Sequence, residues 1–248
     1  SVDLPAEVRL DDEIRAVGEP LPPGDPQAVF LTGATGFVGA YLLDELARRT
    51  RAEVFCLVRA DGEEEARRRL AENLARHRLS PPAERVVVIP GDLSLPRFGL
   101  SEDRFDTLAR EVEAIFHAGA WVNFTYPYEA LAPANVGGTR EARRLAARGR
   151  AKPFHFVSSI AVFAPGAVGE DEVTWEDSPL DATDELFAGY AETKWVAEKI
   201  VRLAGERGVP FTIHRPGVVA GHSETGAGNT SDLVWNAFKG SSQLGAAI

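Results

Sequence analysis

The chain has 248 residues, of which 44% are hydrophobic and 26% are charged, and its formal net charge is −10. This length suits one or two domains with a full core, and the composition excludes a disordered, fibrous or collagen-like chain. No apolar run reaches the roughly 18 residues of a membrane-spanning helix. The negative charge disfavours non-specific nucleic-acid binding, so neither a membrane nor a nucleic-acid partner is expected.

The N-terminus carries no basic-then-apolar signal segment, which predicts a cytoplasmic location. The single cysteine, Cys56, agrees with this, because secreted scaffolds use many cysteines. The chain contains no methionine, which indicates a piece of a longer polypeptide, and we expect it to be monomeric within that polypeptide. No metal site is predicted.

Residues 1–27 are rich in proline and acidic residues and lack a sustained apolar period, so they are predicted to form a linker or a wrapping arm. After them, short apolar runs alternate with amphipathic stretches. Strands are predicted at 28–31, 53–58, 85–89, 114–117, 153–158 and 210–214, and helices at 37–46, 63–78, 129–148, 187–206 and near 232–239. This alternation predicts an α/β fold over residues 28–248, a Rossmann-like doubly wound parallel sheet with helices on both faces.

The first strand-to-helix turn reads Thr32-Gly33-Ala34-Thr35-Gly36-Phe37-Val38-Gly39. Glycines in such a turn let backbone amides approach a pyrophosphate, which then lies at the N-terminal end of the helix. The turn is therefore predicted to bind a dinucleotide cofactor through Gly33, Thr35, Gly36, Phe37, Val38 and Gly39. The alternative is a glycine-rich turn that holds no ligand.

The residue that contacts the adenosine ribose follows the last glycine of such a turn by about 20 positions; an acidic residue there selects NAD and an arginine selects NADP. Arg59 holds this position, which favours NADPH, although the nearby Asp61 would suit NAD. Arg67, Arg68 and Arg69 lie on the next predicted helix, and they either add a second phosphate contact, for which Arg69 is the candidate, or form a solvated face.

Two further strand ends carry small or polar residues. Asp92 and Leu93 follow the third strand, and Ala118, Gly119 and Ala120 follow the fourth. Ligands bind at the carboxyl ends of such strands, so Asp92 is predicted to accept a hydrogen bond from an adenine amine, and the small residues to leave room for a flat ring. The alternative is two loops that need small residues for clearance. His117 is expected to be packed rather than catalytic.

Tyr190 and Lys194 lie four residues apart, on one face of the long predicted helix. A neighbouring cation favours the ionised phenol, so Lys194 is expected to lower the pKa of Tyr190 and make it a proton donor or acceptor near neutrality. Ser158 and Ser159, at the preceding strand end, could offer a hydroxyl to the same carbonyl oxygen. The alternative is a surface tyrosine and lysine on an amphipathic helix.

Together these features resemble the extended short-chain dehydrogenase/reductase superfamily over residues 28–240. Within it, the chain is most similar to the thioester reductase domains of nonribosomal peptide synthetases and carboxylic acid reductases. The resemblance lies in the strings LTGATGFVG, CLVRA, GDLSLPRFGLS, HAGAWVN, PANVGGT, GYAETKWVAEK and RPGVVAG.

The resemblance implies that Ser159, Tyr190 and Lys194 are catalytic, with Lys194 also on the ribose, Arg59 on the 2′-phosphate, and Pro216, Gly217 and Val218 beside the nicotinamide. It implies NADPH-dependent release of an acyl or peptidyl thioester as an aldehyde, or as an alcohol after a second round. The thioester would be held on the phosphopantetheine arm of an upstream carrier domain.

The chain departs from the family pattern at two positions. Serine stands at Ser159 where threonine is common, and alanine stands at Ala118 where many members have asparagine, which puts one cofactor contact in doubt. Family members also continue into a substrate-binding subdomain. We expect this C-terminal subdomain to be largely missing, so that the chain binds NADPH but reduces thioesters poorly.

Cys56 lies inside a predicted buried strand and is expected to be inert, which argues against an acylating aldehyde dehydrogenase. Two other functions stay open. One is a sugar-nucleotide epimerase or dehydratase of the same superfamily, which would usually prefer NAD. The other is a non-catalytic dinucleotide sensor, which would have no need of Tyr190 and Lys194.

Overall fold

A six-stranded parallel sheet forms the centre of the computed structural model, which describes residues 2–22, 24–163, 173–184, 186, 188–229 and 232–245. Its strands are β1 (Ala28–Thr32), β2 (Glu53–Val58), β3 (Val86–Pro90), β4 (Ala114–His117), β5 (Phe154–Val157) and β6 (Phe211–His214). They are arranged in the order β3-β2-β1-β4-β5-β6. The order reverses between β1 and β4, and ligands of doubly wound sheets bind at such a reversal, outside the carboxyl ends of the strands.

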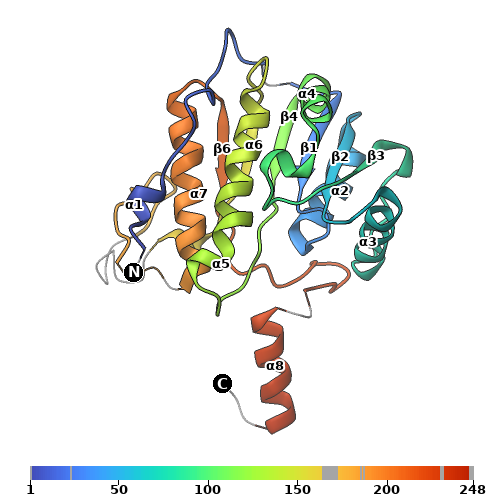
Figure 1. Cartoon of the computed structure of the whole chain (residues 1–248). Helices are drawn as coiled ribbons and strands as arrows, with labels where there is room; N and C mark the ends of the chain where they lie inside the picture. Colours follow the sequence, from blue (N-terminus) through green and yellow to red (C-terminus); the bar gives the residue numbers. More distant parts are fainter. Residues whose placement is uncertain are drawn as a thin grey trace.

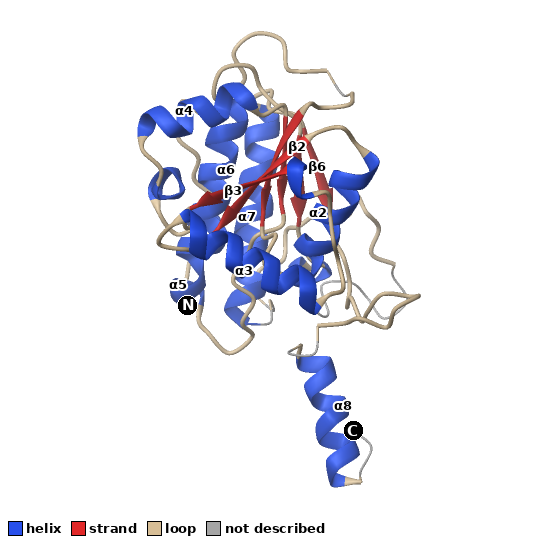
Figure 2. Cartoon of the chain, turned by 90° about the vertical axis from the view of Figure 1, so that its right-hand side faces the viewer, coloured by secondary structure: helices blue, strands red, loops and turns tan. Residues whose placement is uncertain are grey.

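Helices cover both faces of this sheet, as Figures 1 and 2 show. One face carries α2 (Phe37–Arg49) and α3 (Glu63–Arg76), and the other carries α4 (Glu102–Glu111), α5 (Tyr128–Ala132), α6 (Gly138–Ala147) and α7 (Ala188–Glu206). The short α1 (Leu4–Glu7) lies beside α7, and α8 (Leu233–Leu244) extends away from the sheet (Figure 1). The predicted doubly wound α/β fold is confirmed.

Two buried clusters form the core, one on each side of the sheet. Alternate residues of each strand point to opposite faces, so Phe30 packs with the α4–α7 layer whereas Val29 and Leu31 pack with α2 and α3. All five residues of β1 are buried. Among the described residues no helix is both long and apolar enough to cross a membrane.

The helix predicted at 129–148 is present over residues 128–147, but a π-helical turn that the sequence analysis did not predict interrupts its α-helical hydrogen bonding. Residues Pro133–Gly137 form a π-helical turn between α5 and α6. Proline lacks the amide hydrogen that would continue the helical ladder, and the hydroxyl of Thr139 donates to the carbonyl oxygen of Asn135 at 2.6 Å. The interruption therefore has two local causes, and it lies beside α7 and the loop that follows β4.

The helix α4 was missed in the sequence, and other predicted bounds shift by a few residues. Ser101 caps α4 by accepting a hydrogen bond from the amide of Arg104 at 3.3 Å. The strand predicted from residue 85 begins at Val86, because Arg85 closes a 3₁₀ turn. The helix predicted to reach residue 78 ends at Arg76, since Arg78 has a φ of 58°.

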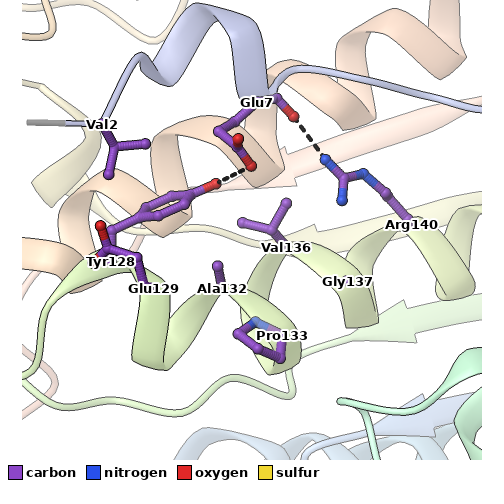
Figure 3. Close-up of a pocket in the computed structure, with 9 residues that line it drawn as sticks. All are labelled: Val2, Glu7, Tyr128, Glu129, Ala132, Pro133, Val136, Gly137 and Arg140. Carbon is purple, nitrogen blue, oxygen red and sulfur yellow. Dashed lines mark hydrogen bonds between the residues drawn. The ribbon is translucent and has the colours of Figure 1, made fainter.

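The N-terminal segment packs on α6 and α7 instead of leaving the fold. Leu4, Leu10 and Ile14 are buried in the same cluster as the helices. Figure 3 shows the pocket of about 480 Å³ where this segment meets α5 and α6; there the hydroxyl of Tyr128 donates to Glu7, and Arg140 donates to the Glu7 carbonyl oxygen at 2.7 Å. The segment thus contributes core residues, which the proline-rich composition did not predict.

Candidate active site

Close backbone contacts shape the turn between β1 and α2. Gly33 has a φ of 84°, and a Cβ at this position would lie 2.6 Å from the amide nitrogen of Gly119. A Cβ on Gly39 would overlap the carbonyl group of Gly33. Gly36, the N-cap of α2, offers no side chain to the first amides of the helix. Those amides are left for an anion at the positive end of the helix.

The turn is also held from α3 by Asn73, which sequence reasoning missed. Its buried side-chain amide donates to the carbonyl oxygens of Ala34 and Gly36, both at 3.2 Å. The asparagine lies on a charged helix far along the chain, so no spacing rule could indicate this contact. Thr35, Phe37 and Val38, the other predicted residues of the turn, are half-buried or exposed.

Arg59 lies just past the end of β2 and is exposed. Within the described part of the chain it makes no ion pair, whereas the three arginines of α3 each have a carboxylate partner: Arg67 pairs with Glu63, Arg68 with Glu72 and Arg69 with Glu65. The Arg69 pair is the loosest, at 3.9 Å. Arg59 is thus the side chain of this group that can pair with a phosphate without giving up a carboxylate.

The loops after β3 and β4 meet near the reversal of strand order. The carboxylate of Asp92 accepts hydrogen bonds from the amide and hydroxyl of Ser94, at 2.8 and 2.7 Å. A Cβ on Gly119 would lie 2.7 Å from the side chain of Leu93, which explains the glycine by packing. Ala118 and Ala120, on either side of it, are half-buried.

His117 lies in the core, as the sequence analysis expected. Its ring nitrogens lie 2.7 Å from the hydroxyl of Thr32 and 3.1 Å from that of Thr139. Burial, together with the charge of Lys194, lowers the pKa of His117 to about 3. The imidazole is neutral at physiological pH and acts as a hydrogen-bonding core residue.

Tyr190 and Lys194 lie one helical turn apart on α7, and both are buried. The ring of Phe124 packs edge-on against Tyr190, with centroids 5.4 Å apart. The ammonium of Lys194 donates to the carbonyl oxygen of Val157 at 2.6 Å and lies 4.3 Å from the centroid of the Phe156 ring. The lysine is therefore held against the end of β5.

The expected lowering of the Tyr190 pKa is not found, and this prediction was wrong for the protein without ligands. Burial raises the pKa of Tyr190 to about 12. Burial also lowers the pKa of Lys194 to about 7, against the opposing charge of Glu198. Desolvation is the largest cause of both shifts, because each charged form loses its water on burial. Tyr190 is consequently a protonated phenol at neutral pH.

The two serines that directly follow β5, Ser158 and Ser159, have different hydrogen-bond partners. The hydroxyl of Ser158 donates to the carboxylate of Glu198 at 2.8 Å, so Ser158 is occupied inside the protein. Ser159 is half-buried, and its oxygen accepts the amide of Ala161 at 3.1 Å. Its hydroxyl hydrogen is directed to no partner in the described residues. Ser159 is thus the serine that can donate to a bound carbonyl oxygen.

The segment after β6 lies beside the turn that follows Ser159. The carbonyl oxygen of Pro216 accepts the amide of Ile160 at 3.2 Å, which joins this segment to the turn after Ser159. Gly217 and Val218 are exposed, Val218 at 71%. They are therefore open to a ring bound at this edge of the sheet.

Asn135 is a further residue that the sequence analysis quoted without a role. Its side-chain oxygen accepts the amide of Trp121 at 2.6 Å, and its side-chain nitrogen donates to the Trp121 carbonyl oxygen and to the hydroxyl of Thr193. The residue lies in the π-helical turn and is buried. Asn135 therefore fastens the loop after β4 to Thr193 of α7, the residue that precedes Lys194.

The fold and the arrangement of these residues define a class: a doubly wound domain of a family that binds a nicotinamide dinucleotide. A family model described as male sterility protein, an NAD-binding family, matches residues 31–248, and the chain belongs to this family.

The proteins similar to this chain in sequence and structure include reductase (R) domains of nonribosomal peptide synthetases. The chain is 48% identical to a linear gramicidin synthase polypeptide of Brevibacillus parabrevis, over 98% of the chain but 5% of that protein. It superposes on the terminal R domain of the myxalamid biosynthetic pathway with a TM-score of 0.94 and 48% identity, covering 99% of this chain and 63% of that one. For the R domain of a nonribosomal peptide synthetase from Mycobacterium tuberculosis, the TM-score is 0.76 and the identity 34%, over 94% and 58% of the two chains.

Proposed function

We propose that this chain binds NADPH and catalyses the reductive release of a carrier-bound acyl or peptidyl thioester as an aldehyde, within a multidomain polypeptide. The observation that carries the proposal is the position of Ser159 and Lys194 at the end of β5: Ser159 follows that strand by two residues, and Lys194, one helical turn from Tyr190, donates to the carbonyl oxygen of Val157. Ser159, Tyr190 and Lys194 form the candidate catalytic corner. The family and its reductase relatives support the same interpretation.

The turn between β1 and α2 fits a dinucleotide, because its glycines allow the close backbone contacts that form the turn and because the first amides of α2 have no side-chain cap. Gly33, Gly36 and Gly39 would hold the pyrophosphate and Arg59 the 2′-phosphate. Lys194 would hold the ribose, and the segment from Pro216 to Val218 would lie beside the nicotinamide. When bound, NADPH supplies a hydride to the thioester carbon.

The residues of this chain act on the oxygen of that thioester. Ser159 donates a hydrogen bond to the carbonyl oxygen, and the protonated phenol of Tyr190 donates its proton as negative charge develops there. The raised pKa of Tyr190 suits this direction of transfer, since the phenol keeps its proton until the oxyanion forms. Collapse of the hemithioacetal then frees the thiol of the carrier arm.

No cysteine takes part in this chemistry. Cys56 is fully buried in β2, and burial raises the pKa of its thiol well above the usual range. A thiolate nucleophile, which an acylating aldehyde dehydrogenase requires, is therefore not formed there.

The test is to mix the protein with NADPH and an acyl thioester of a phosphopantetheinylated carrier domain, and to identify the product by mass spectrometry. We expect an aldehyde, a free carrier thiol and one NADPH consumed per aldehyde. Conversion of a sugar nucleotide with no net consumption of cofactor would instead favour the epimerase class. Binding of NADPH with neither reaction would leave a dinucleotide sensor.

A further inference from the structure

The buried carboxylate of Glu198 lies behind the candidate catalytic pair. Tyr190, Lys194 and Glu198 are spaced by four residues on α7, so their side chains follow one stripe of the helix. Glu198 has no exposed surface. It is thus one helical turn from Lys194, on the side away from Tyr190.

Three side chains donate to this carboxylate, one from α7 and two from the residues that directly follow β5 and β6. The hydroxyl of Ser158 donates at 2.8 Å, Arg202 donates from the same helix at 3.2 and 3.3 Å, and Arg215 donates through two nitrogens, Nε at 3.0 Å and Nη2. Burial opposes the ionisation of Glu198, but the hydrogen bonds of Arg215 and Ser158 and the charges of the two arginines outweigh it and lower its pKa. The side chain is a buried carboxylate anion.

These contacts join the parts of the chain that carry the candidate catalytic groups. Ser158 immediately precedes Ser159, and Arg215 immediately precedes the segment from Pro216 to Val218. Arg215 also donates to the carbonyl oxygen of Glu176 at 2.9 Å. Glu198 therefore fixes the ends of β5 and β6 to the helix that carries Tyr190 and Lys194.

The charge balance gives Glu198 a second effect. The groups that face Lys194 are the neutral His117 from β4, the ring of Phe156 and the carbonyl oxygen of Val157 from β5, and Tyr190 and Glu198 from α7. Among the described residues, the carboxylate of Glu198 is the anion of this group, and it also pairs with Arg202 and Arg215. Without it, the buried Lys194 and the largely buried Arg215 would lose the carboxylate that offsets their positive charges.

We infer that Glu198 is a positioning residue that holds the loops of Ser159 and Pro216 against α7 and favours the charged form of Lys194 against the effect of burial. A buried ion network contributes little to stability compared with apolar residues of the same volume, so its place behind the catalytic pair is better explained by the charge it maintains. The catalytic meaning of that charge rests on the proposed function; the effect on Lys194 itself does not.

The inference is tested by measuring the pKa of Lys194 directly. The chain has four lysines, so the ¹³Cε–¹⁵Nζ signals of a lysine-labelled sample are few, and Lys194→Gln assigns the relevant one. We expect Glu198→Gln to lower the pKa of Lys194 by about one unit or more. Glu198→Asp should keep most of the wild-type value. Glu206→Gln, which removes an exposed carboxylate two turns further along α7, is the matched control and should leave it unchanged.

An unchanged Lys194 pKa in folded Glu198→Gln would overturn the inference, since a purely structural role changes stability and not this titration. If that variant does not fold, Arg202→Gln decides, because it removes a partly exposed cation and should raise the Lys194 pKa. A fall or no change in that variant would overturn the inference as well.

A separate experiment, the measurement of NADPH affinity as a function of pH, tests whether the charge of Lys194 affects cofactor binding. The pH at which affinity declines should move down by the same amount as the Lys194 pKa in Glu198→Gln. If no variant and no wild-type sample binds NADPH, the proposed function fails while the NMR titration still decides the role of Glu198.

Discussion

The glycine turn after β1 and the candidate catalytic corner at the end of β5 are built by different forces. The turn is fixed by contacts between backbone atoms, because a Cβ on Gly33 or Gly39 would collide with backbone. The corner depends on buried charges: Lys194 against Val157, and Glu198 against Arg215. The shape of the turn is therefore set by the packing of the backbone, whereas the protonation states of the corner are set by burial and by neighbouring charges.

The largest effect is expected in the turn, from Gly39→Ala. The added Cβ would overlap the carbonyl group of Gly33, and backbone cannot move aside as a flexible side chain can. We expect the free energy of unfolding to fall by more than about 3 kcal/mol and NADPH binding to be lost. Chemical denaturation measures the first and calorimetry the second.

Gly24→Ala is the matched control, because a Cβ there meets no atom within 4 Å. It should change stability by less than about 0.5 kcal/mol. Equal stability of the two variants would show that the turn is pliable, and the contrast with the catalytic corner would disappear.

The features that could be predicted from the sequence are those that depend on residues close together in the chain. The turn and its helix are local, so spacing alone indicated them, and the strands at 53–58 and 114–117 have the predicted bounds. The π-helical turn at Pro133–Gly137 was not predicted, since its geometry depends on a hydrogen bond to Asn135 as well as on the proline.

The candidate catalytic corner shows why the contacts of Glu198 and the pKa of Tyr190 could not be predicted from the sequence. The partners of Glu198 come from positions 158, 202 and 215, and no helical or strand period relates them. The direction of the Tyr190 pKa was wrong because sequence shows the neighbouring cation but not the burial that outweighs it. Spacing predicts which residues share a helix face; it does not predict how much water they lose.

In the corner, we expect Tyr190→Phe to reduce turnover of a carrier-bound thioester by about 10²- to 10⁴-fold, the usual contribution of a positioned proton donor. NADPH affinity should stay nearly unchanged, because the phenol hydroxyl anchors no part of the cofactor in our proposal. Tyr126→Phe, on the exposed loop after β4, is the control and should keep full activity. Substantial thioester reduction by Tyr190→Phe would remove the tyrosine from the mechanism.

The burial of Lys194 predicts a pH dependence of stability without cofactor. The unfolded lysine has a pKa near 10.5, and the folded one has a pKa of about 7. Between these values the unfolded chain binds the proton and the folded protein does not, so the free energy of unfolding rises with pH, by at most about 1.4 kcal/mol per pH unit. Urea denaturation between pH 7 and 9 measures the slope.

Lys194→Met should flatten that slope, and Lys199→Met, on the same helix but partly exposed beside Asp181, should keep it. An identical slope in Lys194→Met would mean that the lysine is already protonated in the folded protein, and that the corner needs no ligand to charge it.

The smallest effect is expected at Arg59, which lies close to the glycine turn in sequence but is not prearranged as the turn is. It is exposed, and within the described residues it has no ion pair to position it. A 2′-phosphate would give it charge-assisted hydrogen bonds worth about 1.5 to 3 kcal/mol. Calorimetry should therefore find NADPH at least about tenfold tighter than NADH, and Arg59→Ala should narrow that ratio by weakening NADPH alone.

Arg68→Ala separates this specific contact from a general loss of positive charge, since Arg68 is equally cationic but paired with Glu72 at 2.7 Å. It should leave both affinities unchanged. If Arg59→Ala weakens NADH as much as NADPH, the arginine supports the loop after β2 and not the 2′-phosphate. If it weakens neither, Arg69 is the next candidate, because its pair with Glu65 is the loosest of the three on α3. A preference for NADPH over NADH that depends on Arg59 would separate two tasks. In our proposal the backbone turn binds the pyrophosphate, which both cofactors carry. The exposed side chain of Arg59 binds the 2′-phosphate, which only NADPH carries.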